Sequence, residues 1–151
     1  ESPVIEGIEK SNTYLKDTIL DIIIEQSKRR IGVLGLSFKA GTDDLRNSPA
    51  VELVERLIGK GYQVSIYDVN VHLSSLTGTN KEEIERRIPH IRDFIHNDLD
   101  VVIADSEVIV ITYNDKEFKV LIDKHPDKLF IDLARVDSSR RSGGNYIGIS
   151  W

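Results

Sequence analysis

Four short strand-like runs, three of them near-continuously apolar and one alternating, constrain the fold of this chain more than any other feature. They lie at residues 31–36, 62–68, 107–113 and 128–134. The segments between them are predicted to be helices, over residues 49–60, 80–87, 98–104 and 116–125. Apolar strands that alternate with helices are typical of a parallel sheet covered on both faces. We therefore predict an α/β fold, a three-layer sandwich around a mostly parallel sheet.

The first strand and its helix depart from the usual dinucleotide-binding sequence. Glycines at positions 32, 35 and 41 do not match the G-x-G-x-x-G spacing, and the insert KAGTDDLRNSP separates the strand from the helix. Ser48 is a suitable N-cap for that helix, and Pro49 suits its first position. The spacing therefore does not indicate a loop that simply wraps a pyrophosphate.

Four polar segments are expected to meet at one edge of the sheet. They follow the strands in chain order, at residues 36–49, 67–71, 112–115 and 132–139. Ligands of open parallel sheets bind outside the carboxyl ends of the strands, near the point where the strand order reverses. The sequence therefore predicts a binding site at this edge.

The insert carries two cations that suit an anionic ligand. Arg46 offers a planar fork for a diphosphate or carboxylate, while Lys39 supplies a compact charge. The alternative is that both balance Asp43 and Asp44 within the loop. Phe38 precedes them, and a phenylalanine there is more often part of a core than a stacking platform.

Asp68 ends the second strand, where a dinucleotide fold places its ribose-binding acid. It follows Gly32 by 36 positions, whereas roughly 20 is usual in that fingerprint. The pattern therefore favours a structural or turn role for Asp68.

Composition argues against several other classes of protein. A net charge of −5 is unlike the basic surplus of nucleic-acid-binding proteins. No apolar run has the length of a membrane span and no signal peptide is visible, so we expect a cytoplasmic protein. The chain has no cysteine, and its four histidines lack ligand spacing. We therefore expect no disulfide, no metal site and no cysteine nucleophile in it.

The chain has an amphipathic segment ahead of the first strand and a possible strand after the last one. Residues 1–28 are predicted to be helical, either as a connector from an earlier domain or as a helix packed on this sheet. Residues 138–151 are predicted to form a loop followed by a short strand or extension.

One long segment resembles a known family. The run GLSFKAGTDDLRNSPAVELVERLIGKGYQVSIYDVNV is similar to the carboxyl-terminal domain of the UDP-glucose/GDP-mannose dehydrogenase family. The resemblance continues from SNTYLKD near the start, through NKEEIERRIPHI, to the final GISW. It implies a Rossmann-like domain at residues 29–151, preceded by a connector helix at residues 1–28 that ends a central dimerisation region.

The resemblance also implies the reaction of a larger enzyme. In this family an amino-terminal domain binds NAD, a central helical domain forms a homodimer, and the present domain binds the nucleotide sugar. The family oxidises the C6 alcohol of the sugar to a carboxylate, using two NAD molecules and a cysteine nucleophile in the central region. We therefore expect no catalytic residue in this chain and no activity from it alone.

Four residues acquire roles through the resemblance. Phe38 and Lys39 match contacts to the nucleotide sugar, and Arg46 matches a residue that reaches NAD held by another domain. Arg135, in DLARVD, corresponds to a substrate-contacting arginine of the UDP-glucose branch.

GDP-mannose, oxidised to GDP-mannuronate, is the favoured substrate. UDP-glucose or a UDP-N-acetylhexosamine is the alternative. The alternative from another functional class is a nucleotide-binding or regulatory module without redox chemistry. A further alternative is that this domain itself binds NAD.

Overall fold

The computed structural model describes residues 16–36, 48–68, 82, 86 and 88–149. Its strands are β1 (Arg30–Leu34), β2 (Gln63–Tyr67), β3 (Ile95–His96), β4 (Val108–Ile111), β5 (Leu129–Asp132) and β6 (Tyr146–Gly148). Its helices include α2 (Pro49–Gly59), α4 (Leu99–Asp105), α5 (Lys116–Lys124) and a helix at residues 16–25.

The strands form one sheet in the order β3-β2-β1-β4-β5-β6, and all five pairings between them are parallel. The chain builds β1, β2 and β3 outward in one direction, then returns to the other side of β1 and builds β4, β5 and β6. The strand order therefore reverses between β1 and β4. Parallel strands of four or five residues with buried faces on both sides explain the near-continuous apolar runs.

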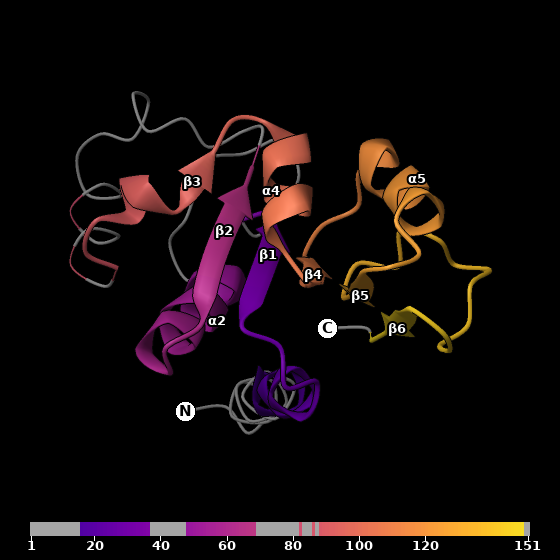
Figure 1. Cartoon of the computed structure of the whole chain (residues 1–151), viewed down its shortest axis with the longest axis horizontal. Helices are drawn as coiled ribbons and strands as arrows, with labels where there is room; N and C mark the ends of the chain where they lie inside the picture. The colour runs from indigo at the N-terminus through magenta and orange to yellow at the C-terminus, as the bar shows by residue number, and fades with distance from the viewer. Residues whose placement is uncertain (1–15, 37–47, 69–81, 83–85, 87, 150–151) are drawn as a thin grey trace, which may run out of the picture.

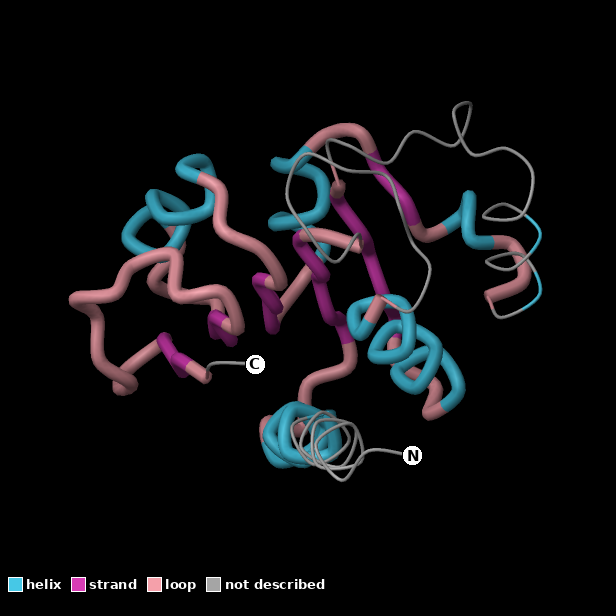
Figure 2. The backbone as a smooth tube through the Cα atoms, turned by 180° about the vertical axis from the view of Figure 1, so that it is seen from behind, coloured by secondary structure: helices cyan, strands magenta, loops and turns pink. Residues whose placement is uncertain are grey.

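Helices cover both faces of the sheet (Figures 1 and 2). One core cluster joins α2 and the helix at residues 16–25 to β1 and β2, and a second joins α4 and α5 to β4. Close approach of α4 to the sheet depends on Gly32, because an added Cβ there would press against the Ser106 side chain. The predicted α/β three-layer fold is confirmed.

The helix at residues 16–25 packs on this domain. Ile19 and Ile23 are fully buried in the cluster formed with α2. Lys16 pairs with Glu52 of α2, and Asp17 pairs with Arg56. Figure 1 shows this helix end-on beside the amino end of β1. A domain boundary at residue 28, and the helix as a connector, stay predictions.

Sequence and structure differ in three local features. The first strand ends at Leu34, two residues earlier than predicted, because Gly35 turns the chain with a φ of 112°. The strand β3 was not predicted, since two half-buried residues at a sheet edge carry no periodicity. Ser48 occupies the N-cap of α2, yet its hydroxyl makes no cap and instead donates to the Leu36 carbonyl at 2.6 Å.

The remaining predicted elements match or fall partly outside the described residues. The final strand is present as β6, parallel to β5. The predicted helix at residues 80–87 lies largely outside the described residues, although Glu82 and Arg86 are helical. In the part of the chain that the structure describes, no helix is long and apolar enough to cross a membrane. A cytoplasmic location stays a prediction.

Candidate functional site

The strand register brings the predicted polar segments to one edge. Leu34 of β1 lies opposite Tyr67 of β2 and Ile111 of β4, and Ile111 lies opposite Asp132 of β5. The residues that follow these four positions therefore leave the sheet side by side. This edge is outside the carboxyl ends of the strands and includes the reversal point between β1 and β4, where ligands of such sheets bind.

Gly35 and Leu36, which follow β1, are held by the neighbouring strands. The Gly35 N–H donates to the Tyr67 carbonyl at 2.8 Å, and the Gly35 carbonyl accepts from the Thr112 hydroxyl at 2.7 Å. A side chain at position 35 would overlap Thr112 and the Tyr113 ring. Only glycine meets both the positive φ and this close contact.

The two ends of the insert are anchored at the same place. The buried Asp68 carboxylate accepts the Leu36 N–H at 2.8 Å, and the Leu36 carbonyl accepts the Ser48 hydroxyl. Asp68 thus has the structural role that its spacing favours. Leu36 and Ser48, which flank residues 37–47 in the sequence, therefore both lie at the reversal point.

Phe38, Lys39 and Arg46 lie outside the described residues. Their predicted contacts with nucleotide sugar and NAD therefore stay predictions. What the structure adds is the position of the neighbouring anchors, Leu36 and Ser48.

Tyr113 lies at this edge, just beyond Thr112 after the end of β4. Its side chain is buried against Phe118, with ring centroids 5.4 Å apart, and its hydroxyl has no hydrogen-bond partner among the described residues. Burial raises the pKa of the Tyr113 phenol, and the Asp68 and Asp115 carboxylates raise it further. The phenol is therefore neutral at physiological pH. Sequence reasoning marked residues 112–115 as polar but could not show that Tyr113 turns inward.

Arg135 lies in the turn that follows β5. Its backbone adopts a φ of 52° and its side chain is exposed. The fully buried Asp132 carboxylate accepts the N–H groups on either side of it, from Ala134 and Val136, each at 3.0 Å. Arg135 is thus the one predicted site residue within the described part of the chain.

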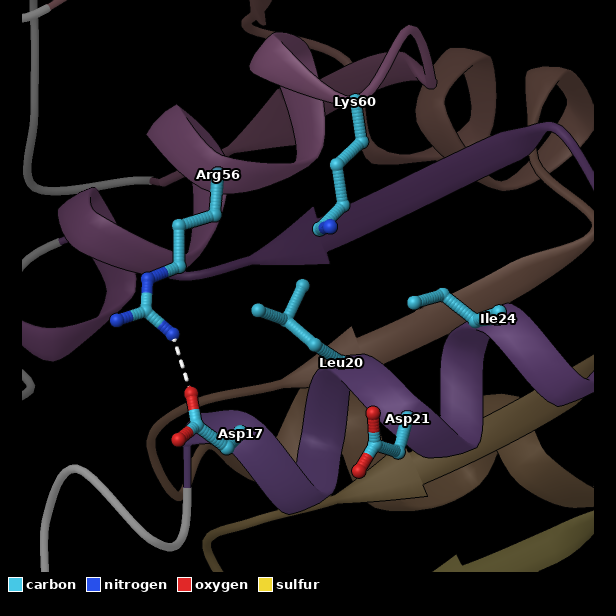
Figure 3. Close-up of a pocket in the computed structure, with 6 residues that line it drawn as sticks. All are labelled: Asp17, Leu20, Asp21, Ile24, Arg56 and Lys60. Carbon is cyan, nitrogen blue, oxygen red and sulfur yellow. Dashed lines mark hydrogen bonds and ion pairs between the residues drawn. The ribbon is translucent and has the colours of Figure 1, made fainter.

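A cavity of about 530 Å³ lies elsewhere, between α2 and the helix at residues 16–25 (Figure 3). Lys60 extends into this gap, and Arg56 reaches across to Asp17 at 2.7 Å. Its acidic side chains come from the helix at residues 16–25 and its basic ones from α2 and the residue after it, and none of its lining residues belongs to the polar segments at the carboxyl edge. We therefore place the candidate site at the carboxyl edge. Among the described residues, no group of histidines and carboxylates could hold a metal ion.

Comparison with known proteins identifies the family of this chain. The sequence model of the UDP-glucose/GDP-mannose dehydrogenase family, UDP binding domain, matches residues 32–137. GDP-mannose 6-dehydrogenase of Pseudomonas savastanoi pv. phaseolicola is 43% identical over all of this chain and 35% of its own length. UDP-glucose 6-dehydrogenase of Rickettsia bellii is 32% identical over 80% of this chain and 27% of its own length.

A solved structure agrees with these sequences. The ternary complex of GDP-mannose dehydrogenase from Pseudomonas aeruginosa superposes with a TM-score of 0.86 at 43% identity. The match covers 100% of this chain and 35% of that one, so the chain spans about a third of the length of the relatives it matches. The chain belongs to the UDP-glucose/GDP-mannose dehydrogenase family, and its residues 32–137 match the UDP binding domain of that family.

Proposed function

We propose that this chain is the nucleotide-sugar-binding domain of an NAD-dependent GDP-mannose 6-dehydrogenase. The observation that carries the proposal is 43% identity to GDP-mannose 6-dehydrogenases along its entire length. Residues 29–151 form the binding domain, and residues 1–28 end the central helical region through which the complete protein forms a homodimer. The product is GDP-mannuronate, a precursor for polysaccharide biosynthesis.

The nucleotide sugar binds at the carboxyl edge, where the strand order reverses between β1 and β4. Phe38 and Lys39 contact it, because they follow an anchored Leu36 by two and three residues and an extended chain spans about 3.5 Å per residue. The Lys39 ammonium donates charge-assisted hydrogen bonds to the diphosphate. Arg135 approaches the same ligand from the turn after β5.

The described residues do not form a dinucleotide-binding turn of the usual kind. In such a turn a glycine-rich loop passes directly from strand to helix, so that the helix N-terminus faces the pyrophosphate. Here residues 35–48 separate β1 from α2, and Asp68 already accepts the Leu36 N–H. NAD is therefore held mainly by another domain, and Arg46 reaches it from this one.

The cysteine that captures the aldehyde also lies outside this sequence, which has none. The chain contributes binding and orientation, while the covalent chemistry takes place in the rest of the enzyme. By itself it is inactive.

The test uses the complete gene product and follows NADH formation with GDP-mannose, UDP-glucose and a UDP-N-acetylhexosamine. GDP-mannose should give the highest kcat/KM. The Rickettsia bellii relative makes UDP-glucose the second candidate, at a lower identity of 32%. No NADH with any nucleotide sugar would reject the dehydrogenase assignment.

Two variants separate the ligands. Lys39→Ala should raise KM for the nucleotide sugar by roughly 10- to 100-fold, since a charge-assisted hydrogen bond contributes about 1.5–3 kcal/mol. Arg46→Ala should act chiefly on KM for NAD. An Arg46→Ala effect confined to the nucleotide sugar would reverse the two roles.

A further inference from the structure

Arg135 occupies a backbone conformation that an arginine rarely adopts. Its φ of 52° lies in the left-handed region, which glycine adopts freely and Asn and Asp adopt at times, but which is strained for arginine. Its side chain is exposed, so packing in the core does not explain why an arginine stands there. An observed backbone outlier of this kind is a reason to look for function.

One buried carboxylate holds the turn on both sides of Arg135. Asp132 Oδ1 accepts the Ala134 N–H at 3.0 Å, and Asp132 Oδ2 accepts the Val136 N–H at 3.0 Å. Asp132 is fully buried at the end of β5, so both bonds are shielded from water. The peptide groups flanking residue 135 are therefore fixed relative to the sheet.

A tyrosine from the next strand holds this carboxylate in turn. The Tyr146 hydroxyl donates to Asp132 Oδ2 at 2.7 Å, and Tyr146 is almost fully buried at the start of β6. Burial raises the pKa of the Tyr146 phenol, and the bond to Asp132 raises it further, so the phenol remains a donor.

The Tyr146 ring is itself held by a cation–π contact with Arg140. The Arg140 guanidinium lies 5.6 Å from the ring centroid and pairs with Asp123 of α5 at 2.8 Å. The contacts run without a break from α5 through Arg140 and Tyr146 to Asp132, and so to the turn that carries Arg135.

We propose that Asp132 and Tyr146 are positioning residues that hold Arg135 for contact with the anionic part of the nucleotide sugar. The inference rests on the proposed function, because it assumes a nucleotide-sugar ligand at the carboxyl edge. If the turn served only folding, glycine at position 135 would suffice, because glycine adopts the same φ without strain. The arginine side chain therefore points to a role in binding.

The test compares Tyr146→Phe with wild type in the complete gene product, using GDP-mannose as substrate. The substitution removes one hydroxyl and keeps the ring under Arg140. KM for GDP-mannose should rise about 3- to 10-fold, the value of one hydrogen bond, while kcat changes less than twofold. A change in kcat or melting temperature with KM unaltered would overturn the proposal.

Tyr62→Phe is the matched control. Tyr62 also carries an arginine over its ring, with Arg29 at 5.9 Å from the centroid, but it precedes β2 at the amino edge. The KM of the Tyr62→Phe variant for GDP-mannose should equal that of the wild type. A similar rise in KM would mean that removal of a tyrosine hydroxyl acts through general stability, which contradicts the proposal.

A double-mutant cycle tests whether Tyr146 acts through Arg135. Arg135→Ala should raise KM, and the double variant with Tyr146→Phe should raise it no further. Multiplied effects would show that Tyr146 acts independently of Arg135 and would overturn the inference. Unchanged KM in Arg135→Ala, with raised KM in Lys39→Ala, would overturn this inference while leaving the proposed function standing.

Amide hydrogen exchange tests the same inference in the wild-type protein, so the result does not depend on the folding of a variant. Saturating GDP-mannose should slow exchange at residues 134 and 136, because opening the turn would also break the ligand contact. Unchanged exchange at both amides with bound ligand would overturn the inference.

Discussion

The turns that follow β1 and β5 both pass through a left-handed residue, but they use it in opposite ways. Gly35 has a φ of 112° and no room for a side chain, whereas Arg135 has a φ of 52° and an exposed one. Each turn has a buried carboxylate that accepts backbone N–H groups, Asp68 in the first and Asp132 in the second. The comparison separates a turn that the packing requires from a turn that presents a side chain.

Gly35→Ala should have the largest effect. The added Cβ would combine a strained φ with overlap against Thr112 and the Tyr113 ring. Left-handed strain and overpacking together should lower the free energy of unfolding by about 3 kcal/mol, measured by urea titration.

Gly59→Ala is the control for this change, because nothing lies within 4 Å of an added Cβ at the end of α2. It should leave stability unaltered or slightly raised. Equal losses in the two variants would contradict a packing requirement at Gly35.

Asp132→Asn should come next, with a loss of about 2–3 kcal/mol. The carboxylate accepts three hydrogen bonds through two oxygens, and an amide replaces one of those oxygens with a donor. Urea unfolding measures the loss. Asp123→Asn, at an exposed ion pair with Arg140, should cost under about 1 kcal/mol. A smaller loss at Asp132 than at Asp123 would remove the basis for a braced turn.

Thr112→Val tests how β4 supports the turn after β1. The Thr112 hydroxyl lies 2.7 Å from the Gly35 carbonyl and 3.1 Å from that of Leu34, and valine retains the shape without the donor. The loss should be about 1 kcal/mol by thermal or urea unfolding. Thr112→Ser keeps the hydroxyl and should cost less; the reverse order would show that the methyl group matters more than the bond.

Arg135→Gly should have the smallest effect and the opposite sign. Glycine relieves the left-handed strain, which stabilises the fold, but it also gives the unfolded chain more conformational freedom, which destabilises it. The net effect should be a stabilisation of about 0.5 kcal/mol. The same variant should weaken binding of GDP-mannose, so stability and affinity would change in opposite directions. A loss of more than about 1 kcal/mol in stability would place Arg135 with Gly35, as a residue that the fold requires.

The layers of this domain were predictable because their causes are local. Apolar runs bounded by polar segments indicated buried parallel strands, and helical patterns between them indicated cover on both faces. The same reasoning predicts a binding site at the carboxyl edge. The predicted roles of Phe38, Lys39, Arg46 and Arg135 came from family resemblance, since spacing alone does not identify a ligand.

The sequence by itself therefore determined the α/β class and the family, and it predicted the edge at which a ligand would bind. Tertiary structure decided which groups meet there. Ser48 donates to Leu36 rather than capping its own helix, and Tyr146 donates to Asp132 across a strand pairing. The physical reason is that hydrophobic periodicity repeats along neighbouring residues, whereas a buried polar group bonds to whatever partner the strand register brings close. Thr112 and Gly35, 77 positions apart, share a hydrogen bond only because β1 and β4 are neighbours in the sheet.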